Sequence, residues 1–293
     1  RYGDEYSEPI KSELNRLIGK RVQSRLDLGV DFKRPDINAV LDLEVEDVEL
    51  QVNSMLIYGQ YNKYSREIPQ TVWPCYNCGG SGCEECDYTG KTYQESVQEI
   101  IQEPFIDAAN ADDGKFHGAG REDIDAKCFG RREFVLELMD PKKRNIDIKK
   151  IQTELNNSQD KVEVFEMQTT HKDKIKELKT KRADKTYRAT VKLSKDIPET
   201  ELQKLDNLIG TIEQETPQRV DHRRASKTRK RKVHTIEYEK IGEGEIELNV
   251  KAEAGTYIKE MISGDENRTK PSVSELLNLK AECTELDVTQ IEK

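Results

Sequence analysis

The sequence predicts an α+β fold that carries a small metal-binding segment. Segments with the two-residue period of a strand, such as Lys185–Leu193, alternate with segments of helical spacing, such as Gln94–Ala108. Four cysteines lie close together between Cys75 and Cys86. A chain of 293 residues is long enough for about two domains.

The composition restricts how the chain can bind a polyanion. Charged residues make up 36% of the sequence and hydrophobic residues 34%, so the surface must be densely charged. The formal net charge is −9, so any nucleic-acid site must be a local basic patch. No run approaches the roughly 18 apolar residues of a membrane span, and no signal peptide is recognised. We therefore expect a cytoplasmic protein that is not bound to a membrane.

The first quarter of the chain is predicted to contain one helix and three strands. Helical spacing over Tyr6–Ile18 is followed by Gly19, where a C-terminal glycine would end the helix. The strand period covers Ile37–Val52 with one shift, and Met55–Tyr58 is a further strand.

The stretch Gly59–Arg66 is predicted to be an exposed turn. It interleaves aromatic and basic residues, with Tyr61, Lys63 and Arg66 as candidate RNA contacts. Rings can stack on bases while cations meet phosphates. An ordinary surface loop explains the same pattern equally well.

The four clustered cysteines predict a structural zinc site. Cys75, Cys78, Cys83 and Cys86 form two C-x2-C pairs separated by four residues, and Zn²⁺ favours four such thiolates in a tetrahedron. Gly79, Gly80 and Gly82 allow the chain to turn back sharply. Two disulfides or a chance cluster are the alternatives, and a further segment could supply a ligand.

The remaining helices and strands are predicted from helical spacing and from the two-residue strand period. Residues 109–117 are predicted to be a polar connection, and Gly242–Gly244 the turn of a hairpin. The predicted helices are Gln94–Ala108, Asn145–Leu155, His171–Leu178, Glu199–Leu208, Gly255–Met261 and Ser272–Leu277, and the predicted strands are Phe134–Met139, Val162–Met167, Lys185–Leu193, Val233–Tyr238, Glu245–Ala252 and Cys283–Val288.

Two further stretches carry candidate chemistry. Arg219–Lys232 is strongly basic, which favours contact with RNA phosphates, although a disordered loop or a targeting signal would look similar. Gly118–Ala126 places glycine turns before a cluster of acids, so a carboxylate such as Asp123 could approach a reacting atom. A solvated surface turn is the alternative.

At this point the sequence resembles the archaeal-type tRNA pseudouridine synthases of the Pus-ten family. The resemblance extends from about residue 30 to the end of the chain. It departs from the family pattern at Phe129–Phe134, which is shorter and lacks a proline. The matching runs are Ile68–Thr71, Phe116–Asp125, Lys185–Ala189, His222–Ala225, Ala252–Glu260, Gly264–Thr269 and Pro271–Leu277.

The resemblance implies both an architecture and a reaction. Residues 1–72 would be a partial THUMP-like RNA-binding segment, residues 73–90 a zinc knuckle, and residues 91–293 a catalytic domain with a mixed or antiparallel sheet. The implied activity is isomerisation of uridine 54, uridine 55 or both in the T-arm of tRNA, without a catalytic cofactor. We expect a monomer.

The resemblance also implies roles for single residues. Asp123 would be the catalytic carboxylate and Lys259 would pair with it. Tyr187 would stack on the uracil with its ring and transfer a proton at C5 with its hydroxyl. The alternatives are catalysis by Asp125, a Tyr187 that is only core, and a Lys259 that is only solvated. The implied substrate-binding residues are Arg121, Tyr61, Lys63, Arg66, Arg219, His222, Arg223, Arg224 and Arg268.

A different class of function is a non-catalytic zinc-containing factor that binds or folds tRNA. The amino-acid composition does not distinguish this factor from an enzyme. Only the enzyme requires Asp123, Tyr187 and Lys259 to meet in one cleft. A zinc-dependent deaminase is excluded, because no His-x-Glu motif accompanies the cysteines.

Overall fold

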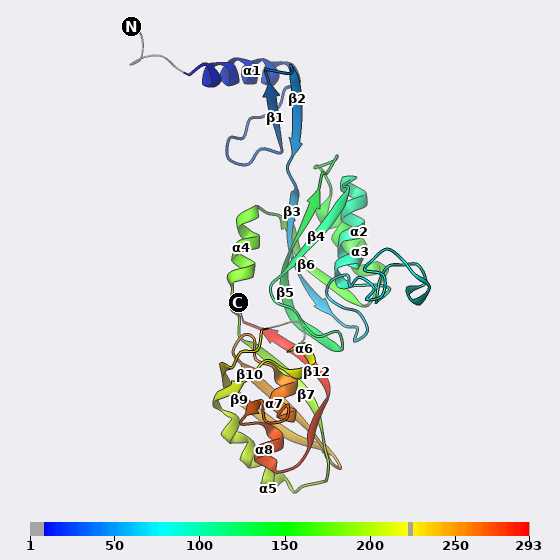
Figure 1. The fold of residues 1–293 in the computed structure, drawn as a ribbon, viewed down its shortest axis with the longest axis vertical. Helices are drawn as coiled ribbons and strands as arrows, with labels where there is room; N and C mark the ends of the chain where they lie inside the picture. Colours follow the sequence, from blue (N-terminus) through cyan, green and yellow to red (C-terminus); the bar gives the residue numbers. More distant parts are fainter. Residues whose placement is uncertain (1–8, 222–224, 293) are drawn as a thin grey trace. The chain divides into compact units, whose positions relative to one another are not determined.

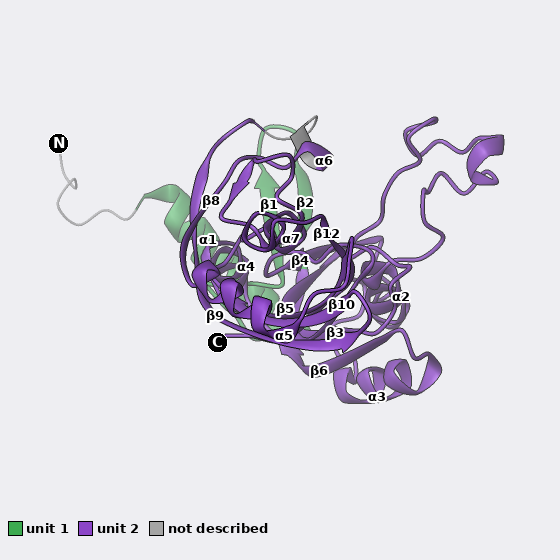
Figure 2. Ribbon diagram, turned by 90° about the horizontal axis from the view of Figure 1, so that it is seen from below, with its two compact units in different colours: residues 1–54 green, residues 55–293 purple. Residues whose placement is uncertain are grey.

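The structure is a computed structural model that describes residues 9–221 and 225–292. The chain forms two compact units, residues 1–54 and residues 55–293 (Figure 2). The predicted boundary at residue 72 therefore differs from the structure, because the strand that begins at Met55 joins the large sheet of the second unit.

The first unit consists of a helix and a hairpin. Helix α1 (Ile10–Leu26) precedes antiparallel strands β1 (Ile37–Asp42) and β2 (Asp47–Val52), which confirms the predicted strand pair. The prediction that Gly19 ends the helix was wrong. The helix continues to Leu26 because one internal glycine costs only about 1 kcal/mol. The first residues of the predicted helix lie outside the described part of the chain.

The second unit is built on a mixed ten-stranded sheet with the order β11-β8-β9-β10-β7-β12-β5-β3-β6, in which β4 pairs with β5. The pairing of β12 with β5 is parallel and the others are antiparallel. This confirms the predicted α+β class and mixed sheet. The strands are β3 (Met55–Lys63), β4 (Asp113–Gly118), β5 (Ala126–Met139), β6 (Val162–Thr169), β7 (Lys185–Leu193), β8 (Gly210–Gln214), β9 (Arg229–Gly242), β10 (Glu245–Ala252), β11 (Thr269–Lys270) and β12 (Ala281–Ile291).

Helices cover both halves of the sheet (Figure 1). Helices α2 (Val97–Ala109) and α3 (Ile148–Ser158) pack on β3, β5 and β6 to form one core. Helix α4 (Lys172–Thr180) packs on the opposite face of these strands, since Leu56 and Tyr58 face it while Met55 and Ile57 face the first core.

A second core fills the other half of the sheet, around β7, β9, β10 and β12. Short helical segments cover it: α5 (Glu199–Leu202), the 3₁₀ helix η2 (Gln203–Leu208), α7 (Ile258–Ser263) and α8 (Val273–Leu277). Ser272 caps α8 by accepting a hydrogen bond from the Glu275 N–H. Two further short helices are η1 (Glu84–Cys86) and α6 (Gln218–Asp221). None of the described helices has the length and apolarity needed to cross a membrane.

Two predictions about irregular segments were wrong. Gly59–Lys63 is part of β3 rather than an exposed turn, because β5 and β6 flank it on both edges. Residues 113–118 form β4 rather than a polar connection. The end of the basic stretch Arg219–Lys232 belongs to β9, which begins at Arg229. Strand β8 was not predicted.

Close packing at Gly59 gives a test of the β3 assignment. A Cβ atom at this position would lie 2.9 Å from the buried Phe134 ring and 3.1 Å from Met167. We expect Gly59→Ala to destabilise the fold by about 1–3 kcal/mol through overpacking. The control is Gly242→Ala in β9, where the nearest atom is 3.5 Å away and we expect a change within about 0.5 kcal/mol. Equal urea midpoints for the two variants would contradict the packing.

Candidate functional site

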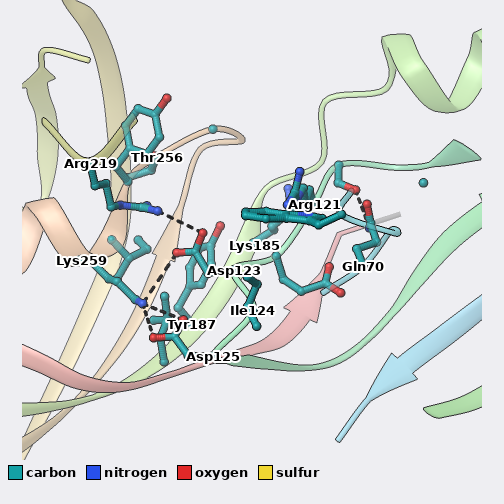
Figure 3. A pocket seen from close by; sticks show the side chains of 18 of the residues that line it. Gln70, Arg121, Asp123, Ile124, Asp125, Lys185, Tyr187, Arg219, Thr256 and Lys259 are labelled. Carbon is teal, nitrogen blue, oxygen red and sulfur yellow. Dashed lines mark hydrogen bonds and ion pairs between the residues drawn. The ribbon is translucent and has the colours of Figure 1, made fainter. Parts of the chain in front are cut away.

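One large cavity collects side chains from segments that are distant in the sequence (Figure 3). Its volume is about 1000 Å³. Asp123, Tyr187 and Lys259, the three residues predicted to meet in one cleft, all line it. The remaining lining residues are Gln70, Trp73, Tyr93, Gly118, Gly120, Arg121, Glu122, Ile124, Asp125, Lys185, Arg219, Gly255, Thr256, Tyr257, Ile258 and Leu286.

The Asp123 carboxylate faces two cations. Its Oδ1 lies 3.2 Å from Arg219 Nη1, and its Oδ2 lies 3.8 Å from Lys259 Nζ. The Asp123 side chain remains 34% exposed, so it is accessible from the cavity. Positive charge on two sides of a partly exposed carboxylate compensates its negative charge while leaving it open to a ligand.

Lys259 bonds mainly to Asp125, which differs from the predicted pairing with Asp123. Its Nζ lies 2.8 and 2.7 Å from the two Asp125 carboxylate oxygens. Partial burial alone would raise the pKa of Asp125, but the bond from Lys259 outweighs it and lowers that pKa. Lys259 therefore bridges the two aspartates, with the shorter contacts to Asp125.

Arg219 connects Asp123 to a second acid that the sequence did not reveal. Its Nε donates to Glu260 Oε1 over 2.6 Å, and Glu260 is buried on α7. The predicted phosphate-binding residue thus lies inside the cavity between two carboxylates.

A buried polar network holds the loop that carries Asp123. Glu122 forms a 2.7 Å ion pair with Arg132 of β5, and each side chain is only 1% exposed. The Tyr61 hydroxyl donates to Glu122 over 2.8 Å, and the Gln70 amide donates to Tyr61 and to the Gly120 carbonyl. Arg132 also donates to the Ala119 carbonyl over 3.0 Å. Buried charges are tolerated only where they are paired in this way.

Lys63 completes this network from β3. Its buried ammonium donates to the carbonyls of Ile68, Asp123 and Ile124, over 3.0, 3.2 and 2.6 Å. Burial lowers the Lys63 pKa. The prediction that Tyr61 and Lys63 contact RNA is wrong, because both side chains are fully enclosed and bond to the Asp123 loop.

Tyr187 lies on β7, with only 8% of the residue exposed. Burial raises the pKa of its phenol to about 12. Tyr187 therefore presents a neutral aromatic ring to the cavity near neutral pH.

Trp73, Tyr93 and Arg121 form an aromatic and cationic side of the same cavity. The Trp73 and Tyr93 rings pack edge to face with centroids 5.7 Å apart, and the Arg121 guanidinium lies 4.9 Å above the Trp73 ring. Neither Trp73 nor Tyr93 was predicted as a site residue, because the signal in this part of the sequence is the cysteine cluster between them. Their places directly beside the cysteine segment were the available signal.

Two other predicted substrate contacts, Arg66 and Arg268, do not line this cavity. Arg66 donates to the carbonyls of Asp125 and Leu286 and lies 2.7 Å from Asp287. Arg268 donates to the Thr216 carbonyl over 3.1 Å. His222, Arg223 and Arg224 lie outside the described residues.

The four clustered cysteines have a geometry that fits a tetrahedral metal. The Sγ atoms of Cys75 and Cys83, of Cys78 and Cys86, and of Cys83 and Cys86 are 3.9, 3.9 and 3.7 Å apart. Thiolates at the usual Zn–S distance in a tetrahedron would lie about 3.8 Å from one another.

The backbone of this segment also stabilises thiolates. The N–H groups of Cys83 and Gly90 both donate to Cys86 Sγ over 3.3 Å. Burial would raise the pKa of this thiol, but the bonds from these two N–H groups and from neighbouring thiols outweigh it and lower the pKa to about 6. A Cβ at Gly90, whose φ is +70°, would lie 2.4 Å from the Gly80 carbonyl, so only glycine permits this closure.

Comparison with protein families gives two matches to the chain. The family "Pus10, C-terminal" matches residues 56–292, and the family "Pus10 THUMP domain, archaeal" matches residues 1–42.

Curated proteins with the name "tRNA pseudouridine synthase Pus10" are similar to nearly the whole chain. The protein from Methanothrix thermoacetophila is 44% identical over 98% of the chain, and that from Methanopyrus kandleri is 44% identical over 97%. The protein from Methanocaldococcus jannaschii is 46% identical over 93%. The aligned part spans 64%, 67% and 60% of these relatives' own lengths.

Solved structures give only distant similarities. A Cbf5-Nop10-Gar1 complex has a chain with a TM-score of 0.41 and 21% identity, covering 67% of this chain and 45% of that one. A structure described as a pseudouridylate synthase has a TM-score of 0.26 and 11% identity, with coverages of 93% and 86%.

The Glu122–Arg132 ion pair gives a test of the loop network. Removing one charge leaves the other buried and unpaired, so Glu122→Leu and Arg132→Met should each destabilise the fold by about 3–5 kcal/mol. The double variant should be less destabilised than the sum of the two, as measured by urea unfolding in a double-mutant cycle. Additive losses would mean that the two side chains do not interact.

Proposed function

This chain belongs to the Pus10 family, and from that premise we propose that it is a tRNA pseudouridine synthase with Asp123 as its catalytic carboxylate. The observation that carries the proposal is the cavity in which Asp123, Tyr187 and Lys259 converge. A factor that only binds or folds tRNA has no need for a carboxylate placed between two cations inside a cavity.

The proposed reaction moves one bond of the uridine. The N1–C1′ bond breaks, a C5–C1′ bond forms, the C5 hydrogen leaves as a proton and N1 gains a proton, so no oxidant or cofactor is consumed. Asp123 acts on the ribose or the base as an ionised carboxylate. Arg219 and Lys259 balance its charge and orient it, since they contact its two different oxygens.

Tyr187 is proposed to stack against the uracil. Its pKa of about 12 keeps the phenol protonated near neutral pH, which favours a stacking role over proton acceptance at C5. A uridine in a folded arm must leave its stack at a cost of a few kcal/mol. The ring of Tyr187 and the Trp73–Arg121 side of the cavity offer contacts that offset this cost.

The proposed substrate is the T-arm of tRNA, with uridine 54, uridine 55 or both as targets. The names of the curated relatives support tRNA as the substrate, and the motifs shared with the Pus-ten family support the T-arm positions. We further propose that the protein acts in the cytoplasm as a monomer.

We also propose that Cys75, Cys78, Cys83 and Cys86 hold a structural zinc ion. Four thiolates complete a tetrahedron and leave no open position for a substrate or water. The ion would fix the segment between Trp73 and Tyr93, where the Thr92 N–H donates to the Trp73 carbonyl over 2.9 Å. The metal would act by holding the chain, not by taking part in the reaction.

The two neighbouring aspartates give the test of the catalytic assignment. We expect Asp123→Asn to lower pseudouridine formation on unmodified tRNA by at least about 10³-fold, since an amide cannot replace the carboxylate. Asp125→Asn is the matched control, because it removes the Lys259 partner but keeps the Asp123 carboxylate. It should retain most of the activity. Full activity of Asp123→Asn together with an inactive Asp125→Asn would transfer the role to Asp125.

The zinc proposal is tested by metal content. The purified protein should hold about one zinc per chain, and the Cys78→Ser/Cys86→Ser variant should hold almost none. Cys283→Ser is the control, because Cys283 lies on β12 and bonds to a backbone carbonyl. The zinc site does not exist if the unsubstituted protein and the double variant contain equally little metal.

A further inference from the structure

A second, smaller cavity of about 240 Å³ adjoins the one that contains Asp123. Gly120, Lys185 and Gly255 line both cavities, so the two are neighbours. The other lining residues of the smaller cavity are Ala119, Glu133, Lys181, Arg182, Ala183, Arg231, Ala254 and Ile291. None of these residues has a role in the reaction described above.

The charges around this cavity are opposite to those of the chain as a whole. Four cationic side chains and one carboxylate line it, although the protein carries a net charge of −9. The carboxylate, Glu133, is already engaged by Lys181 over 2.6 Å and by the Tyr58 hydroxyl over 2.8 Å. The other three cations, Lys185, Arg182 and Arg231, have no carboxylate within hydrogen-bonding distance among the described residues.

Arg231 has unused donor capacity. Its Nε is buried without a hydrogen-bond partner among the described residues, and its Nη1 donates to the Lys230 carbonyl. The nearest acid, Glu253, lies 3.7 Å from Nη1. A buried unpaired donor is costly, so an anionic acceptor here would be favourable.

Lys185 also lies in the positively charged surroundings of this cavity. Burial and the nearby Arg132 charge lower its pKa to about 8, and its Nζ donates to the Ala183 carbonyl. The adjacent acid Asp184 is paired with His234 over 2.8 Å. An anion in the cavity would stabilise the charged form of Lys185.

We propose that this second cavity binds a phosphate of the RNA backbone, directly next to the nucleotide held in the main cavity. A guanidinium and an ammonium are the groups that proteins use for phosphate oxygens. The shared lining residues place that phosphate beside the target nucleotide. This inference rests on the proposed function. It adds which backbone phosphate of the RNA lies beside the site when the target nucleotide is bound.

The salt dependence of RNA binding provides the first test. Each phosphate contact adds about one unit to the slope of log affinity against log salt concentration. For a T-arm stem–loop RNA, we expect Arg231→Gln to reduce the slope by about one and the affinity by about tenfold. Lys230→Gln is the matched control, because Lys230 is the next residue on β9, is 75% exposed and pairs with Glu213. Equal losses in the two variants would reveal only a general charge effect and would overturn the proposal.

Neutral methylphosphonate linkages on either side of the target uridine identify the phosphate. One of these linkages should weaken the binding of RNA to the unsubstituted protein but not weaken its binding to Arg231→Gln any further. If the effects of the linkage and of Arg231→Gln add at every position, the cavity does not bind a backbone phosphate. If inorganic phosphate competes with the RNA while no linkage is sensitive, the cavity holds free phosphate and the proposal fails. Arg182→Gln, an exposed loop substitution, replaces Arg231→Gln if the latter does not fold.

These measurements need no turnover, so they separate the two proposals. If the unsubstituted protein forms pseudouridine but Arg231→Gln binds the RNA equally well, the enzyme assignment stands and the phosphate subsite is rejected. If one linkage is sensitive but no pseudouridine forms, the phosphate subsite stands and the enzyme assignment is rejected.

Discussion

The buried ion pair between Glu122 and Arg132 is the interaction on which the site depends. It fixes the residue next to Asp123 to strand β5, with both charges withdrawn from water. Because a buried charge needs several partners, Tyr61, Gln70 and Lys63 are also drawn inward to satisfy the loop. The polar residues of β3 are therefore part of the architecture of the site.

The second constraint is the junction between the two halves of the sheet. The parallel pairing of Leu286–Val288 in β12 with Ala126–Cys128 in β5 begins where the Asp123 loop ends. Arg66 bonds to the carbonyls of Asp125 and Leu286 and so links the loop to the junction. Tyr187 and Lys259 reach the cavity from the other half of the sheet. Two independent cores thus hold the groups that face each other across it.

Features with a local signal could be predicted from the sequence. The two C-x2-C pairs and the period of β7 each depend on neighbouring residues, and each agrees with the structure. Features that depend on the three-dimensional environment could not be predicted. Tyr61 and Lys63 in β3 have the composition of a surface loop, and only their burial between β5 and β6 reveals their role. The contacts of Lys259 with Asp125 and of Arg219 with Glu260 depend on side-chain placement, which no spacing rule specifies.

The most direct measurement is a crystal structure of the Asp123→Asn variant bound to an unmodified T-arm RNA. We predict that C1′ of the target uridine lies within about 3.5 Å of the residue 123 side chain, as for a reacting pair. We also predict that the uracil rests against the Tyr187 ring. A bound RNA whose target uridine remains stacked in the arm, outside the cavity, would contradict the proposed role of Asp123.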